Sequence, residues 1–236
     1  MSSPFERLAK SASQRYRSAG VTAWQFARGK LLGDPVYRAV WEGPWIREGT
    51  VVDLGCGQGL MLSLFAAARE QSDLYPNHVA RDQCRLIGIE TRSRVASIAQ
   101  NALGHHAVIV SGDARSVTIP RCRTLLLFDV LHMMNASDQE ALLLQALAAL
   151  EDLGVIIVRE ADANAGWRFR LVQWANRAKA LLKGYSSRSF HFRSGAGWMS
   201  WLEGHGLKVE SSPMYAGTPF GNHLFVARRK DISTGV

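Results

Sequence analysis

The stretch Val51–Leu60 constrains the fold of this 236-residue chain more than any other part of it. It begins with a short apolar run, continues through Asp53, and then places glycine at positions 55, 57 and 59. A helical pattern of apolar residues follows, from Leu60 to about Arg69. This order predicts a strand, a tight turn and a helix start, where a ligand approaches the backbone of the turn and the helix directs free N–H groups towards it.

The rest of the chain repeats this unit, which indicates an α/β protein. The run Thr124–Val130 is almost continuously apolar, as expected of a central parallel strand that is buried on both faces. A capping box at Ser137–Glu140 predicts the start of a helix that runs to Leu150. Further strands are predicted at 85–90, 107–110 and 155–158, a helix at 93–103, and a closing antiparallel hairpin between 207 and 227.

Polar residues follow the predicted strands where each strand ends. They are Glu90 and Thr91, Asp113 (followed by the apolar Ala114), Asp129, and Glu160. The carboxyl ends of parallel strands meet at one edge of a sheet, and ligands of α/β proteins bind in the crevice there. A carboxylate such as that of Glu90 accepts two hydrogen bonds from a diol, so this position suits the hydroxyls of a ribose.

The sequence Asp53-x-Gly55-x-Gly57-x-Gly59 resembles motif I of the class I S-adenosylmethionine-dependent methyltransferases. It departs from the dinucleotide fingerprint G-x-G-x-x-G, because its glycines alternate and Leu occupies position 60. With the acids at the later strand ends, the resemblance covers residues 51 to 160. It implies a Rossmann-like, seven-stranded, mostly parallel sheet with helices on both faces and an antiparallel last strand.

The resemblance also implies the cofactor, S-adenosylmethionine, which becomes S-adenosylhomocysteine, and a reaction that needs no metal. Glu90 corresponds to the acid that binds the ribose, and Asp113 with Ala114 to the pair that contacts the adenine. Asp129, or the carbonyls beside it, faces the methionine amine. The complete set of expected cofactor residues is Asp53, Gly55, Cys56, Gly57, Gly59, Glu90, Thr91, Asp113, Ala114 and Asp129.

The sequence indicates the acceptor of the methyl group less directly than it indicates the cofactor. Asp129-Val-Leu-His132 replaces the Asn/Asp-Pro-Pro-aromatic tetrad that nucleic-acid amino-methyltransferases use, and is similar to the small-molecule branch of the family. The chain resembles the small methyltransferases of bacterial aryl polyene and xanthomonadin-type pigment pathways, through segments that include 159–162 and 190–193. This implies methylation of a hydroxyaryl group, on carbon or oxygen, with the acceptor free or tethered to an acyl carrier protein. The candidates for the general base are His132, Glu160, His191 and His223.

The formal net charge of +8 is unevenly distributed. Residues 161–193 hold seven Lys and Arg residues against Asp162 alone, and residues 1–50 hold eight against four acids. Such surfaces attract polyanions, among them acidic carrier proteins and nucleic acid, or they are simply solvated. An RNA methyltransferase is therefore the alternative hypothesis, although the missing tetrad makes nucleic acid the less favoured partner. A non-catalytic adenosylmethionine-binding protein is a third.

The chain divides into a helical N-terminal extension at 1–48, a methyltransferase domain at 49–230 and a tail at 231–236. The extension is either a lid over the site or a plain cover for the core, and 70–83 is expected to be a surface insertion. The three cysteines lack the spacing of a metal site or disulfide framework, so no metal is expected. No secretory signal and no apolar run of about 18 residues is found, which predicts a cytoplasmic protein without a transmembrane segment.

Overall fold

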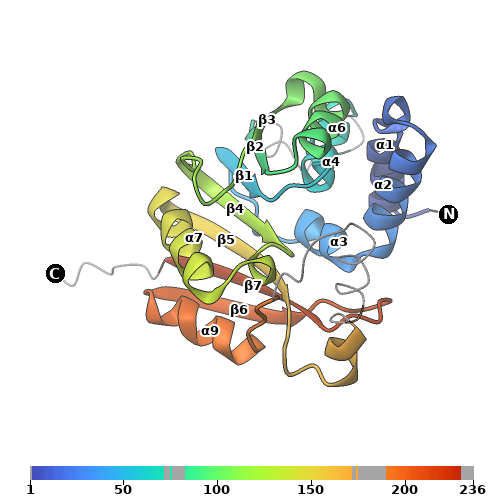
Figure 1. Ribbon diagram of the computed structural model, residues 1–236. Helices are drawn as coiled ribbons and strands as arrows, with labels where there is room; N and C mark the ends of the chain where they lie inside the picture. Colours follow the sequence, from blue (N-terminus) through green and yellow to red (C-terminus); the bar gives the residue numbers. More distant parts are fainter. Residues whose placement is uncertain (1, 72–74, 76–82, 172–173, 175–189, 230–236) are drawn as a thin grey trace.

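A seven-stranded sheet forms the centre of the computed structural model, which describes residues 2–71, 75, 83–171, 174 and 190–229 (Figure 1). The strand order is β3-β2-β1-β4-β5-β7-β6; β1 to β5 are parallel, and β7 runs antiparallel to both β5 and β6. The predicted Rossmann-like sheet with its antiparallel closing hairpin is confirmed. The strands are β1 Thr50–Leu54, β2 Arg85–Glu90, β3 Ala107–Ser111, β4 Cys122–Phe128, β5 Leu150–Ala161, β6 Leu207–Pro213 and β7 Asn222–Arg229.

Helices cover both faces of this sheet (Figure 1). One buried apolar cluster joins the sheet to α1 Pro4–Gln14, α2 Val21–Gly33, α3 Pro35–Glu42, α4 Leu60–Arg69 and α6 Ser93–Leu103. A second cluster joins the opposite face to α7 Ala136–Ala149 and α9 Gly195–Gly204. Successive side chains of a strand point to opposite faces, so each central strand contributes to both clusters. None of the described helices is long and apolar enough to cross a membrane.

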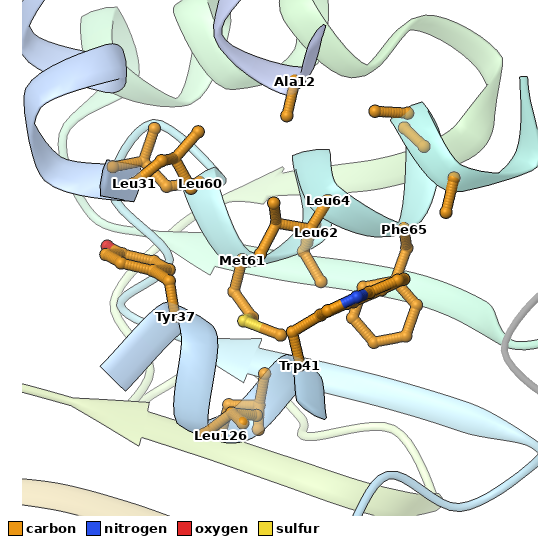
Figure 2. Packing of buried hydrophobic residues seen from close by; sticks show 14 of the residues in the cluster. Ala12, Leu31, Tyr37, Trp41, Leu60, Met61, Leu62, Leu64, Phe65 and Leu126 are labelled. Atoms are coloured by element: carbon orange, nitrogen blue, oxygen red, sulfur yellow. The ribbon is translucent and has the colours of Figure 1, made fainter. Parts of the chain in front are cut away.

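The N-terminal helices share the first apolar cluster with the sheet. Ser3 begins α1 with a capping box, because its hydroxyl accepts from the N–H of Glu6 while the Glu6 carboxylate accepts from the N–H of Ser3. Trp41 of α3 meets the ring of Phe65 edge-on, with centroids 5.6 Å apart (Figure 2). These contacts place α3 directly against α4, the helix that follows the glycine turn.

One local prediction is wrong. The helix α7 is capped by Asn135 and not by a box at Ser137, since the Asn135 side chain accepts from the N–H of Asp138 at 2.8 Å and Ser137 donates to Asn135 at 2.7 Å. The expected surface insertion at 70–83 and the tail at 231–236 lie largely or wholly outside the described residues. Their predictions, and the proposed domain boundaries, stay predictions.

Candidate functional site

The glycine turn between β1 and α4 is held to the end of β2. The N–H groups of Gly55 and Cys56 both donate to the Ile89 carbonyl, at 2.7 and 3.1 Å. All three glycines have a positive φ, of 70°, 58° and 73° in chain order. A Cβ on Gly55 would lie 2.5 Å from Val130, whereas a Cβ on Gly57 would meet nothing within 4 Å. The open side of the turn at Gly57 is therefore where a ligand can lie against the backbone.

Two buried carboxyl groups lie under this turn. Glu90 accepts from the N–H of Gly57 at 2.9 Å through Oε2, and from the N–H and Nε of Arg92 at 3.0 and 2.8 Å through Oε1. Burial, and then the charge of Glu90, raise the pKa of Asp53 to about 8. Two buried carboxyl groups whose charges repel each other favour either a proton or a positively charged ligand beside them.

Cys56, in the same turn, fills space against β2. Its Sγ atom would be 2.7 Å from a Cβ on Gly88, so the two residues fit only because β2 has glycine there. Burial, followed by the charges of Asp53 and Glu90, raises the pKa of the Cys56 thiol, which keeps it protonated and unreactive. The thiol therefore shapes the floor of the turn and carries no chemistry of its own.

The next acid, Asp113, lies at the end of β3 and is half-buried. Its carboxylate accepts from Nε and Nη2 of Arg115, the latter at 2.6 Å, and this partner lowers the pKa of Asp113. Arg115 reaches across to Asp138 as well, at 2.7 Å. Ala114 is buried beside Asp113, whereas Thr91 after β2 is exposed. The site thus continues as a polar edge along the ends of β2 and β3.

At the end of β4, Asp129 adopts a positive φ of 59°, which is uncommon for a residue with a side chain. Its N–H donates to the Arg159 carbonyl at 2.9 Å, and its carboxylate contacts Nη2 of the same arginine. Nη1 of Arg159 donates to both carboxylate oxygens of Asp34, at 2.9 and 2.8 Å. A buried arginine therefore connects the crevice to the N-terminal helices.

Two of the four predicted catalytic residues form a close pair. His132 Nδ1 lies 2.7 Å from Glu160 Oε2, and Glu160 Oε1 accepts from the N–H of Leu131 at 2.7 Å. Burial alone would lower the pKa of His132, but the charge and hydrogen bond of Glu160 outweigh it, so this pKa is raised. With its Nδ1–H donated to the carboxylate, His132 presents Nε2 as an acceptor for a proton.

The other two predicted residues lie near the pair. His191 donates its backbone N–H to the His132 carbonyl at 3.0 Å. His223 is the residue of β7 directly opposite Glu160, and its ring lies 3.8 Å from Asp162. The structure thus brings all four residues together, but only His132 and Glu160 share a side-chain hydrogen bond among the contacts described.

Phenylalanine rings border the His132 side chain. The ring of Phe192 is stacked on that of His132, with centroids 5.0 Å apart and planes 7° from parallel. Phe169 meets Phe192 edge-on at 4.9 Å, and Phe190 lies 6.1 Å from His132. These rings are half-buried and make an aromatic wall, here defined as Phe169, Phe190 and Phe192. A planar apolar ligand would find matching surfaces beside the imidazole.

Two residues that organise the site were not predicted to take part in it. Arg159 follows the strand alternation and points to the face opposite Glu160, towards α3. Gln139 is fully buried, donates to the carbonyls of Leu131 and His191 at 2.9 and 2.7 Å, and accepts from Arg193. Gln139 thereby joins the turn that contains His132 to the segment that contains Phe190 and Phe192. A polar residue at a core-facing position of α7 was the available signal.

Comparison with known proteins gives a family and a fold. The model of the family described as methyltransferase domain matches residues 25–212. No curated protein sequence matches the chain. Many solved structures share the fold, and three of them are described below.

An O-methyltransferase family 2 protein from Planctomyces limnophilus, in complex with apigenin, is 18% identical with a TM-score of 0.62, over 94% of this chain and 62% of that one. An O-methyltransferase from neocarzinostatin biosynthesis, in complex with S-adenosylmethionine and 2-hydroxy-5-methyl naphthoic acid, is 22% identical with a TM-score of 0.57, over 92% and 59%. The chain thus spans about 60% of the length of these two proteins.

A chain of the complex between the Haloferax volcanii Trm112 methyltransferase activator and a methyltransferase is 16% identical with a TM-score of 0.63, over 97% of this chain and 98% of that one. At these identities the likeness to all three structures is one of fold.

Proposed function

Because the chain belongs to the methyltransferase domain family, we propose that it transfers a methyl group from S-adenosylmethionine to a small aromatic hydroxyl compound. The observation that carries the proposal is the His132–Glu160 pair, which lies beside an aromatic wall. His132 follows β4, which pairs with β1, the strand that leads into the glycine turn, and Glu160 lies in β5, the next strand along the same sheet. A methyl donor at the turn and a phenolic acceptor at the pair would then occupy one crevice.

The residues at the strand ends fit this cofactor. The open side of Gly57 leaves room for it, Glu90 would hold the ribose, and Asp113 with Ala114 would contact the adenine. The buried Asp53 and Glu90 favour a cation, and the cofactor carries its positive charges on the sulfonium and ammonium groups. The bound cofactor supplies an electrophilic methyl group, so the protein needs mainly to align the acceptor and take up its proton.

The space at Gly57 gives a matched test. Gly57 and Gly104 have nearly the same φ, 58° and 56°, and a Cβ on either meets nothing within 4 Å. Alanine at each position should destabilise the fold, because both have a positive φ that a side chain disfavours, and the cost should be at least as large at Gly104, whose ψ of −129° lies outside the left-handed helical region. Only Gly57→Ala should weaken S-adenosylmethionine binding in calorimetry, by about tenfold. Equal affinities in the two variants would contradict the placement of the cofactor.

His132 is suited to the proton transfer that a phenol requires. A phenol near its ordinary pKa of about 10 is a weak nucleophile at neutral pH, and removal of its proton strengthens it. His132 Nε2 would accept the hydroxyl proton, which would leave the acceptor oxygen able to take the methyl group that the bound cofactor would supply. Glu160 holds the Nδ1–H and stabilises the imidazolium that results.

Among small aromatic hydroxyl compounds, we propose as the acceptor a hydroxyaryl intermediate of a pigment or related secondary-metabolite pathway, free or tethered to an acyl carrier protein. The aromatic wall supports a planar ring, and similar folds have been solved with apigenin and with a hydroxynaphthoic acid. The excess of Lys and Arg in residues 161–193 supports an acidic carrier, since carrier proteins are acidic.

Transfer of a labelled methyl group separates the acceptor classes. The purified protein is incubated with methyl-labelled S-adenosylmethionine and, in parallel, a hydroxybenzoic acid, the same acid as a carrier-protein thioester, and total RNA. We expect label in the aromatic acid or its thioester, with the thioester preferred. Label in RNA alone would replace this proposal with the RNA methyltransferase.

A further inference from the structure

The guanidinium of Arg159 is shared between two carboxylates that belong to different parts of the chain. Arg159 is 2% exposed, and it donates to both oxygens of Asp34, the residue that caps the start of α3. Its other terminal nitrogen contacts Asp129 at the end of β4. The Asp34 carboxylate is buried, whereas 37% of the Asp129 side chain is exposed. One end of this cluster is therefore in the core and the other opens to solvent.

The charges of these three residues do not cancel. Arg159 is one cation between two anions, which leaves one net negative charge on these three residues. The charge that balances it belongs to Lys30, which lies 2.9 Å from Asp34 at the far end from Asp129, and whose side chain is 40% exposed, so that water screens its charge. Arg159 and Lys30 outweigh the effect of burial and lower the pKa of Asp34, which is consequently ionised near neutral pH. Because Asp34 takes up much of the charge of Arg159, Asp129 is left with an unbalanced negative charge on the exposed side.

The helix α3 brings a second group to the same place. Tyr37 lies three residues after Asp34, on the same face of the helix, and its ring is buried next to Leu31 and Leu60 (Figure 2). Burial raises the pKa of its hydroxyl, which also experiences the charges of Arg159, Asp34, Asp53 and Asp129. One N-terminal helix thus contributes both an anion and a neutral hydroxyl to the surroundings of Asp53 and Asp129.

We propose that Asp34 sets the charge of the pocket for the amino-acid end of the cofactor. The Asp34 carboxylate balances the positive charge of Arg159 on the buried side, and this leaves Asp129 with the negative charge that binds an ammonium group. The inference rests on the proposed function, and it assigns to α3 a part in cofactor binding that reaches further than covering the core. Without Asp34, Arg159 and Asp129 would neutralise each other.

The test compares two ligands that differ only at this end. S-adenosylhomocysteine carries the ammonium group, and 5′-methylthioadenosine lacks the whole amino-acid part. In Asp34→Asn, which keeps a good helix cap but removes the charge, calorimetry should show S-adenosylhomocysteine bound about tenfold more weakly. The affinity for 5′-methylthioadenosine should change less than about twofold. Glu42→Gln is the control, since it removes one charge from the exposed surface of the same helix.

A double variant distinguishes charge from structure. Asp34→Asn with Arg159→Met restores one net negative charge to the cluster, so the affinity for S-adenosylhomocysteine should return towards that of the wild type. Equal weakening of both ligands in Asp34→Asn, or no recovery in the double variant, would overturn the inference. If Asp34→Asn does not fold, Asp34→Ser, which also caps a helix, is measured in the same way. Failure of the wild type to bind either ligand would instead refute the proposed function.

Discussion

Replacement of His132 by alanine is expected to lower kcat by about 100- to 10,000-fold, the usual contribution of a positioned general base. The reason is the geometry of the pair, in which Glu160 holds Nδ1 at 2.7 Å and leaves Nε2 to take the acceptor proton. The affinity for S-adenosylmethionine should be unchanged, because no predicted cofactor residue depends on the imidazole. A loss of activity with intact cofactor binding would thus place His132 on the acceptor side of the crevice.

The pH profile gives a second measure of the same pair. The pKa of His132 is raised, so kcat/KM should increase with pH and reach its plateau only above about pH 6.5, the ordinary value for histidine. In Glu160→Gln the midpoint should move to lower pH, because the carboxylate that stabilises the imidazolium is gone. His205→Ala, which changes an exposed histidine at the C-terminal end of α9, is the control and should retain the activity. Full turnover in His132→Ala, or an unmoved midpoint in Glu160→Gln, would show that another group takes the proton.

Local patterns were sufficient to predict much of the fold. The helices α4 and α6 begin and end where the apolar periodicity indicated, because tertiary packing and local preference agree there. The start of α7 could not be predicted in this way. Asn135 and Ser137 are both good caps two residues apart, and the choice between them depends on which oxygen reaches the free N–H of Asp138.

The site, like the fold, could be predicted only in part from local patterns. Parallel strands end at one edge, so the sequence could indicate that Asp53, Glu90, Asp129 and Glu160 lie along one crevice. It could not predict which of them pair. The contact of His132 with Glu160 depends on a short turn at Leu131–Met133, and that of Arg159 with Asp34 joins residues 125 apart in the chain. No local pattern specifies such contacts.

Replacement of Asp53 by asparagine is expected to make the ligand-free protein more stable while it weakens cofactor binding. The pKa of Asp53 is about 8 in the folded chain against an ordinary value of 3.8, so the folded state holds a proton that the unfolded state releases. The free energy of unfolding of the wild type should therefore fall as the pH rises from about 4 to 8. An asparagine side chain cannot lose a proton, so Asp53→Asn should not show this fall. Its free energy of unfolding, measured by urea denaturation, should be about 1–3 kcal/mol higher than that of the wild type at pH 8 and nearly the same at pH 4.

Cofactor binding should release the proton that Asp53 holds in the ligand-free protein. A cofactor with positive sulfonium and ammonium groups favours the ionised form of Asp53, so its binding must release the proton that burial retains. In the wild type, calorimetry in buffers of different ionisation enthalpy should detect the release of about one proton near pH 7, and affinity should increase with pH up to about 8. Asp53→Asn should bind at least about tenfold more weakly and release no proton. Proton release that persists in this variant would show that a different group faces the charge of the cofactor.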